Sequence, residues 1–232
     1  MSTWLGIDTS TDVCAGLAVD GVVVASRLLA DRRAHAEQLM PMIVSMLADQ
    51  GVSLGDVDGI AVGVGPGPFT GLRVGVATAF GIASATGAAV RGVCSLDVVA
   101  AQWARAGAPE EFVAVSDARR REVYWARYAA AGSRLAGPFV TAPSEVPALP
   151  SCGPGALLLT SEPSDPGVDQ DASGPAGVAA PASLDAGVLA AVGPALPDAG
   201  LTPLYLRRPD AEVSTSRKST LLQPRLTLGR RG

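Results

Sequence analysis

The stretch GPGPFTGLRVG, residues 65–75, joins two segments with different hydrophobic patterns. An apolar run over residues 59–64 predicts a buried strand, and small residues over 72–85 predict a helix. A strand, a glycine-rich loop and a helix in this order often bind phosphate, because backbone N–H groups converge at the loop. Pro66 and Pro68 have no N–H to donate, and no Gly-Lys-Ser/Thr follows, so this loop is not a P-loop. We interpret it as a stiff turn that presents the helix to a partner.

Small residues recur at every fourth position along this predicted helix, at Gly71, Gly75, Ala79, Ala83 and Gly87. Each glycine inside a helix costs about 0.5–1 kcal/mol relative to alanine, so a close neighbour is expected to compensate. That neighbour can belong to a partner or to another part of this chain, and the spacing alone leaves both readings open.

The expected elements alternate in type along the first half of the chain. Asp20-Gly21 is typical of a type I′ hairpin turn between two strands. A strand, helix, strand order favours an α/β layer fold. The strands are expected at residues 4–8, 13–19, 22–29, 59–64, 88–93, 112–116, 122–128 and 204–206, and the helices at 34–50, 72–85, 95–105 and 184–192.

The helix expected at 34–50 has a methionine-rich apolar face. Leu39, Ile43 and either Met46 or Leu47 share that face, with Met40 nearby. Such a face is typical of a core, and it also suits a surface that adapts to a partner.

Composition excludes several classes of protein. With 48% hydrophobic and 17% charged residues, the chain can build a real core. Its three cysteines are far apart, which favours buried thiols in a reducing cytoplasm, and His35 is its only histidine, which argues against a histidine-rich metal site. We see no signal peptide and no apolar run long enough for a membrane span, so we expect a cytoplasmic protein without a membrane segment.

Charge is distributed unevenly along the chain. Residues 1–206 carry a net charge of −9, and residues 207–232 carry +5. A basic end of this kind is usually a solvated tail. It can also contact RNA, here through Arg207, Arg208, Arg217 and Lys218.

Asp8-Thr9-Ser10 follows the first expected strand and is a weak nucleotide motif. A carboxylate followed by hydroxyls can orient a cation and contact phosphate, as in actin-like and sugar-kinase ATPases, but the same string forms ordinary turns. The matching second-lobe stretch, residues 115–119, contains no glycine for close backbone approach. At most half of a nucleotide site is therefore predicted.

Taken in order, these segments resemble the bacterial TsaB (YeaZ) family over residues 3–208. The resemblance rests on the Gly/Pro loop above all, and on Asp8-Thr9-Ser10, His35-Ala36-Glu37-Gln38-Leu39, Ser95-Leu96-Asp97, Asp117-Ala118-Arg119 with Glu122-Val123-Tyr124, and Pro203-Leu204-Tyr205-Leu206-Arg207. It implies an α/β chain with the two-lobe fold of actin-like ATPases (ASKHA, RNase H-like) and a reduced second lobe. We expect an N-terminal lobe at 1–108, a C-terminal lobe at 109–208 and a mobile basic tail at 209–232.

The resemblance also implies a function in making N6-threonylcarbamoyladenosine (t6A) in tRNA. The family supplies a non-catalytic dimerisation subunit that binds the catalytic paralogue TsaD, while TsaE is an ATPase that joins the pair. No catalytic residue, metal ligand or cofactor is then expected in this chain, and ATP and metal are expected on the partner subunits. The implied partner surface on the first two helices comprises Leu39, Met40, Ile43, Met46, Leu47, Leu72, Arg73, Gly75, Val76, Ala79 and Ala83.

Two other readings remain. One is an autonomous ATP-dependent enzyme of the actin-like or sugar-kinase class, with Asp8 as cation ligand and Thr9 and Ser10 near phosphate. The other is an RNA-binding module that works through the basic end. The sequence also leaves open whether the chain pairs with a second copy of itself.

Overall fold

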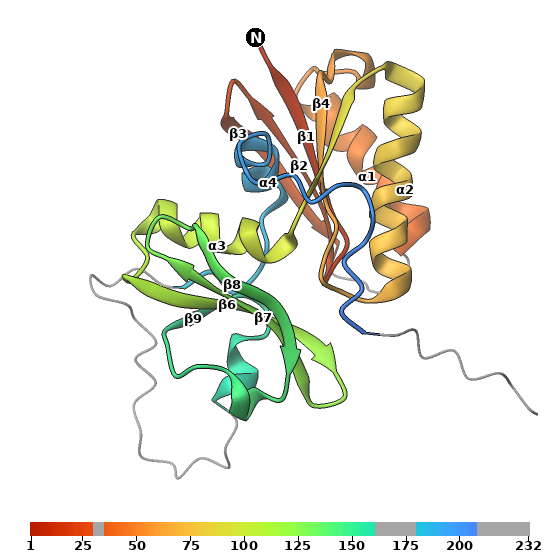
Figure 1. The fold of residues 1–232 in the computed structure, drawn as a ribbon. Helices are drawn as coiled ribbons and strands as arrows, with labels where there is room; N and C mark the ends of the chain where they lie inside the picture. The colour runs from red at the N-terminus through yellow and green to blue at the C-terminus, as the bar shows by residue number, and fades with distance from the viewer. Residues whose placement is uncertain (30–34, 161–179, 208–232) are drawn as a thin grey trace, which may run out of the picture.

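The computed structural model describes residues 1–29, 35–160 and 180–207, and its ribbon forms two lobes, each built on one sheet (Figure 1). The sheet of the first lobe has the strand order β3-β2-β1-β4-β5. Its first three strands form an antiparallel meander, and β4 and β5 continue it in parallel. The strands are β1 (Thr3–Asp8), β2 (Val13–Val19), β3 (Val22–Leu29), β4 (Gly59–Gly63) and β5 (Ala89–Val93).

Helices cover both faces of this sheet. The helices α1 (His35–Asp49) and α2 (Phe69–Thr86) pack on one face, and α4 (Ala186–Val192) packs on the other (Figure 1). Side chains alternate along a strand, so Leu5 and Ile7 of β1 share a core with α1. Gly6 between them faces α4, where a Cβ would collide with the backbone of Ala186.

The second lobe repeats the strand order of the first lobe in shortened form. Its sheet has the order β8-β7-β6-β9, with three antiparallel strands and then a parallel fourth. The strands are β6 (Glu111–Arg119), β7 (Glu122–Ala129), β8 (Arg134–Thr141) and β9 (Ser151–Cys152). Because β9 has only two residues, the structure confirms the predicted reduced second lobe.

Three further short elements and one helix complete the described chain. The helix α3 (Ser95–Ala106) packs on the second sheet, where Trp103 meets Phe112 edge-on with ring centroids 4.9 Å apart. The 3₁₀ turns are η1 (Leu54–Asp56), η2 (Pro143–Glu145) and η3 (Ala156–Leu159).

The chain crosses between the lobes more than once, which corrects the single boundary predicted near residue 108. The helix α4 belongs to residues predicted in the second lobe, yet it packs on β1, β2 and β3 of the first. The segment after α4 also lies against the first lobe. Ala199 N–H donates to Gly92 O at 2.9 Å, and Leu204 N–H donates to Val64 O at 2.8 Å. The predicted tail at 209–232 lies outside the described residues.

The strand predictions differ from the structure in three places. Residues 204–206 were expected as a strand, but they form no ladder, and Leu204 N–H donates to the O of Val64, the residue after β4. In contrast, β8 and the two-residue β9 were not predicted at all.

Candidate functional site

Asp8 lies at the end of β1 and is 1% exposed. Its Oδ1 accepts hydrogen bonds from Ser10 N–H at 2.8 Å and Ser10 Oγ–H at 2.6 Å. Its Oδ2 accepts one from Ser95 Oγ–H, also at 2.6 Å. Both oxygens therefore bind groups of this chain, and the hairpin and the start of α3 are joined through one carboxylate.

Burial raises the pKa of Asp8 above its usual value of 3.8, although the hydrogen bonds from Ser10 and Ser95 lower it in part. Burial is costly for a carboxylate unless hydrogen bonds compensate. The three hydroxyl and amide donors supply that compensation here. In this conformation Asp8 is thus a structural anchor.

Thr9 connects the hairpin to the Gly/Pro loop. Its hydroxyl group donates to Gly71 O at 2.7 Å, and the oxygen Oγ1 accepts from Gly75 N–H at 3.1 Å. A Cβ at Gly71 would lie 2.6 Å from Thr9 O, and one at Gly75 would lie 2.5 Å from Thr9 Oγ1. At Gly71 and Gly75 the small residues therefore admit a turn of the same chain, which is the internal reading that the sequence left open.

Two small voids lie beside this hairpin, lined by residues of both lobes. One void of about 10 Å³ is lined by Asp8, Thr11, Asp12, Cys14, Pro154 and Leu184. A second of about 10 Å³ is lined by Ser10, Thr11, Ser95, Leu96, Val99, Ser116, Pro154 and Leu184. Each has room for roughly one water molecule. Neither of these two voids beside the predicted nucleotide hairpin has room for a nucleotide in this conformation.

The structure corrects the predicted partner surface at seven of its eleven positions. These seven are buried within the core of this chain, so their side chains cannot contact a partner in this conformation. They are Leu39, Ile43, Met46, Leu47, Leu72, Gly75 and Ala79. The four that retain exposed surface are Met40, Arg73, Val76 and Ala83, and for these the partner contact stays a prediction.

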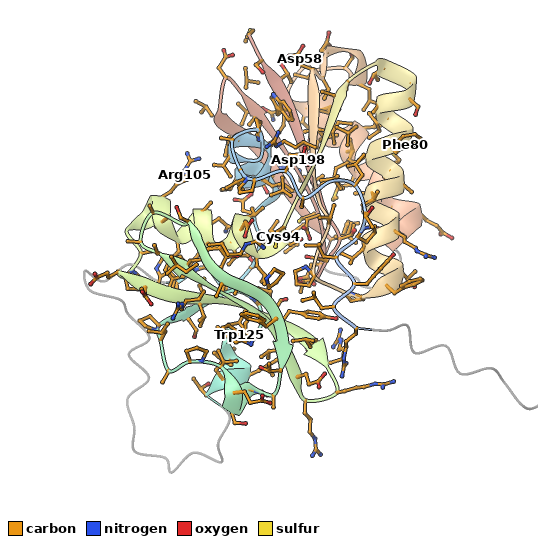
Figure 2. The ribbon with its side chains drawn as sticks, in the orientation of Figure 1. Asp58, Phe80, Cys94, Arg105, Trp125 and Asp198 are labelled. Carbon is orange, nitrogen blue, oxygen red and sulfur yellow. The ribbon has the colours of Figure 1, made fainter. Side chains whose placement is uncertain are left out.

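The outward faces of the same two helices carry large apolar side chains that the sequence reading missed. Val44 on α1 is 48% exposed, and Phe80 on α2 is 62% exposed. Figure 2 shows Phe80 on α2 directed away from the sheet. Their sequence signal was available, because each directly follows a core residue, Ile43 or Ala79, and so lies about 100° around the helix from it, where a polar residue is expected.

Arg73 is held at the start of α2. Its guanidinium lies 3.8 Å from the centroid of the Phe69 ring, and its Nε–H donates to Tyr205 Oη at 3.0 Å. The rings of Phe69 and Tyr205 are tilted by 30° to each other, with centroids 4.8 Å apart. This cluster fastens the segment after α4 to α2.

The backbone of the three consecutive arginines, Arg119, Arg120 and Arg121, forms the β6–β7 turn. Arg119, Arg120 and Arg121 have φ angles of 62°, 53° and 63°. Asp117 accepts from Arg119 N–H at 2.6 Å and lies 3.1 Å from Arg119 Nη1. Of the predicted RNA contacts, Arg207 donates to Ala118 O at 2.9 Å and pairs with Glu122, while Arg208, Arg217 and Lys218 lie outside the described residues.

Side chains of the kinds that bind metal ions do not cluster in the described part of the chain. Within residues 1–29, 35–160 and 180–207, no three His, Cys, Asp or Glu side chains lie close enough to hold an ion. Cys14, Cys94 and Cys152 are buried and unpaired by disulfides, and burial raises the pKa of the Cys94 thiol to about 12. Across those same ranges, none of the helices combines the length and apolarity that a membrane crossing requires.

The fold and the hairpin together define the class of protein. Two sheets with this repeated strand order, an aspartate hairpin after the first strand and a lobe-crossing final segment are those of the actin-like ATPase fold (ASKHA, RNase H-like), as predicted.

Comparisons with known proteins agree and identify the family. The family model of tRNA N6-adenosine threonylcarbamoyltransferase (TsaD) matches residues 23–171. The structure of YeaZ from Pseudomonas aeruginosa is 31% identical, with a TM-score of 0.66, covering 84% of this chain and 91% of that one. The chain therefore belongs to the TsaB (YeaZ) family, which confirms the resemblance in its sequence.

Two relatives in sequence are similar over different lengths. An uncharacterized protein of Mycobacterium tuberculosis (strain H37Rv) is 44% identical over 223 residues, which are 91% of this chain and 95% of the relative. The tRNA threonylcarbamoyladenosine biosynthesis protein TsaB of Escherichia coli is 40% identical over 126 residues. That second match spans 53% of this chain and 54% of the relative.

Proposed function

We propose that this chain is a subunit of the machinery that makes t6A in tRNA, where it binds the catalytic paralogue TsaD and supports threonylcarbamoyl transfer to the adenosine next to the anticodon. Membership of the TsaB family and the name of the Escherichia coli relative support the pathway. In this proposal the chain makes no bond itself, and TsaE, ATP and the metal act on the partner side. The complex works in the cytoplasm, and this chain interacts with tRNA as part of that complex.

The observation that carries the proposed docking is the outward face of α1 and α2. Large apolar side chains exposed on adjacent surface helices mark an interaction surface when they form a patch. Val44 and Phe80 point outward while the opposite stripes of both helices fill the core. Met40 and Val76 border the core stripe and keep part of their surface exposed. We assign this outer face, defined by Met40, Val44, Val76 and Phe80, to the contact with TsaD.

Charge placed on this outer face should break the complex. We expect Val44→Glu and Phe80→Glu each to weaken binding to TsaD of the same organism about tenfold or more, because each buries an unpaired carboxylate in the contact. Calorimetry of the purified pair gives the affinity, and nucleoside analysis of tRNA from cells that depend on this chain gives the t6A level.

Leu157→Glu is the matched control, because Leu157 is 78% exposed on η3 of the second lobe. It should leave both the affinity and t6A unchanged. Wild-type affinity in both outer-face variants would overturn the assignment of this surface. Wild-type t6A in cells that lack the chain altogether would overturn the proposed function.

The rival enzyme reading is tested by calorimetry of the full chain with ATP and Mg²⁺. Because both oxygens of Asp8 are bound to Ser10 and Ser95, and the voids beside them hold about one water each, we expect no binding in the micromolar range. Micromolar binding that is lost in Asp8→Ala would favour the autonomous enzyme instead.

A further inference from the structure

Two of the three arginines between β6 and β7 form a tight hairpin loop. Arg119 and Glu122 are register partners of the two strands, so Arg120 and Arg121 are the two loop residues. Their φ angles of 53° and 63° have the signs that a type I′ loop requires. All three arginines are exposed.

Arginine is an unfavourable choice for this loop backbone. A residue with a Cβ seldom adopts a positive φ, and Asn-Gly is the preferred pair in two-residue loops of this kind. Backbone strain is often retained where the side chains have a function. The backbone therefore does not explain Arg120 and Arg121, and the reason for them lies in their side chains.

The two carboxylates that flank the loop in sequence are already paired. Asp117 lies 3.1 Å from Arg119 Nη1, and Glu122 pairs with Arg207. Among the residues that the structure describes, Arg121 has no hydrogen-bond or ion-pair partner. The loop therefore presents positive charge that its acidic neighbours do not cancel.

The basic carboxyl-terminal residues begin beside the same loop. Arg207 donates to Ala118 O at 2.9 Å and pairs with Glu122, the residue that follows the loop. It is the last residue that the structure describes and the first of the residues 207–232, which carry a net charge of +5. The fold thus brings two basic segments together although they are far apart in the sequence.

This distribution of charge suits a partner that carries many phosphates. The planar guanidinium group of arginine matches phosphate oxygens, and a polyanion gains from each further contact by releasing counterions. Residues 1–206 carry a net charge of −9, so the rest of the chain repels such a partner. Contact is therefore favoured at the loop and at the basic segment that begins beside it.

We propose that the β6–β7 loop binds the phosphate backbone of RNA, with Arg120 and Arg121 donating to phosphate oxygens. The choice of RNA among polyanions rests on the proposed function in tRNA modification. The loop shares no residue with the outer face of α1 and α2, so RNA and TsaD are assigned to different surfaces of the chain.

Replacing the loop by the residues that its backbone prefers separates charge from folding. Arg120→Asn combined with Arg121→Gly removes both guanidinium groups, and the melting temperature should stay the same or rise. We expect this double variant of the full chain to bind an unmodified tRNA transcript about tenfold or more weakly than the wild type does. Fluorescence anisotropy at about 50 mM KCl measures the affinity, and the plot of log K against log salt should become less steep by about 1–2.

Arg27→Gln combined with Arg105→Gln is the matched control. It removes the same amount of charge from exposed positions on β3 and α3, and it should change the affinity for tRNA by less than about twofold. Vesicles of phosphatidylglycerol and phosphatidylcholine in equal amounts test a membrane surface as the rival polyanion. We expect the full chain to bind them more weakly than tRNA.

Four results would each overturn the proposal. The first is that the full chain does not bind tRNA at all. The second is a loop variant with wild-type affinity, which would leave the contact to another part of the chain. The third is an equal loss in the control, which would make net charge the cause. The fourth is tighter binding to the vesicles than to tRNA.

The proposed function and this contact can fail separately. Wild-type t6A in cells that lack the chain would reject the proposed function. Loop-dependent binding of tRNA in the same study would still support the contact.

Discussion

At the scale of single residues, the two buried aspartates hold the start of α3 from both sides. Asp8 accepts from Ser95 Oγ–H, the first residue of the helix, and so ties it to β1 of the first sheet. Asp97, two residues later, accepts from Tyr128 of the second sheet. Figure 2 places Cys94 at this junction, where the ribbon passes from β5 into α3. The lobes therefore share one short segment that is fixed by polar bonds as well as by packing.

Asp8→Ala should destabilise the protein even though it removes a single side chain. The change leaves the hydroxyls of Ser10 and Ser95 without their acceptor in a buried site. We expect the free energy of unfolding to fall by about 2–4 kcal/mol, measured by urea denaturation. Asp49→Ala, at an exposed ion pair with Arg27, should cost less than about 1 kcal/mol. Equal losses in the two variants would show that the buried hydrogen bonds of Asp8 stabilise the protein no more than an exposed ion pair does.

The pH dependence of stability should report Asp97. Burial raises its pKa above 3.8, while Tyr128 and Arg134 lower it in part. The folded state then holds this proton more tightly than the unfolded state does. Its stabilising contribution is complete below the unfolded pKa and is lost as the pH rises through the folded pKa.

Asp97→Asn removes that titration. We therefore expect the free energy of unfolding of the wild type, minus that of the variant, to decrease as the pH rises from about 4 to 7. Urea denaturation of both proteins across this range measures the difference. An increase with pH would contradict a raised pKa for Asp97.

At the scale of elements, glycines in two strands determine where α4 can lie. Gly6 of β1 and Gly16 of β2 are paired in register, and a Cβ at either would collide with the backbone of α4. The helix itself is rich in alanine and glycine, so its backbone approaches the sheet closely. Only glycine leaves room for this contact.

Gly16→Ala should therefore weaken the packing of α4. We expect a loss of about 1–3 kcal/mol in the free energy of unfolding, because the added methyl group overpacks a backbone contact. Gly81→Ala on α2 is the opposite case, since a Cβ there meets nothing within 4 Å. It should gain about 0.4–1 kcal/mol through better helix propensity. Thermal and urea denaturation would show whether each variant loses or gains free energy of unfolding. A stabilised Gly16→Ala would contradict this contact.

Most strands and helices were predictable because their hydrophobic residues recur at the regular spacing of a strand or a helix. The exceptions have physical causes. The strand β8 contains Pro138, which argues against a strand because it cannot donate to a ladder. It is tolerated because β8 is the edge of its sheet. Residues 204–206 have a strand-like composition but form no ladder: Leu204 N–H donates to Val64 O, and Tyr205 N–H donates to Pro203 O within the segment.

The candidate surface was predictable by helix but not by residue. Periodicity finds the apolar face of a helix, and in α1 and α2 that face is the core of this chain. Leu39 and Ile43 were therefore assigned to a partner although they are buried, while Val44 and Phe80 were missed. A single sequence also does not say which sheet a short helix such as α4 will cover, because small residues fit either.

At the scale of the whole molecule, the segment after α4 binds the lobes together. Leu204 packs against the cores of both lobes, and the neighbouring Tyr205 reaches α2. Arg207 then reaches the β6–β7 turn through Ala118 O and Glu122. This lobe-crossing segment therefore joins the two lobes in addition to the polar bonds at the start of α3.

Leu204→Ala should loosen both lobes together. We expect a loss of about 1–3 kcal/mol, below that of a fully buried leucine because Leu204 keeps some exposure. Hydrogen exchange should accelerate at β4 in the first lobe and at β6 in the second. Leu157→Ala, on an exposed 3₁₀ turn, should leave exchange at β4 unchanged. Acceleration confined to one lobe in Leu204→Ala would contradict the bridging role.

The close seat of α4 against Gly6 and Gly16 has a consequence for synthesis on the ribosome. The amino-terminal strands emerge first, yet the helix that packs on one side of their sheet, α4, comes only at residues 186–192. The surface of the sheet on which α4 packs therefore stays uncovered in the nascent chain while more than a hundred further residues are translated. Its first lobe matures late, and chaperones that shield unfinished sheets should meet it before release.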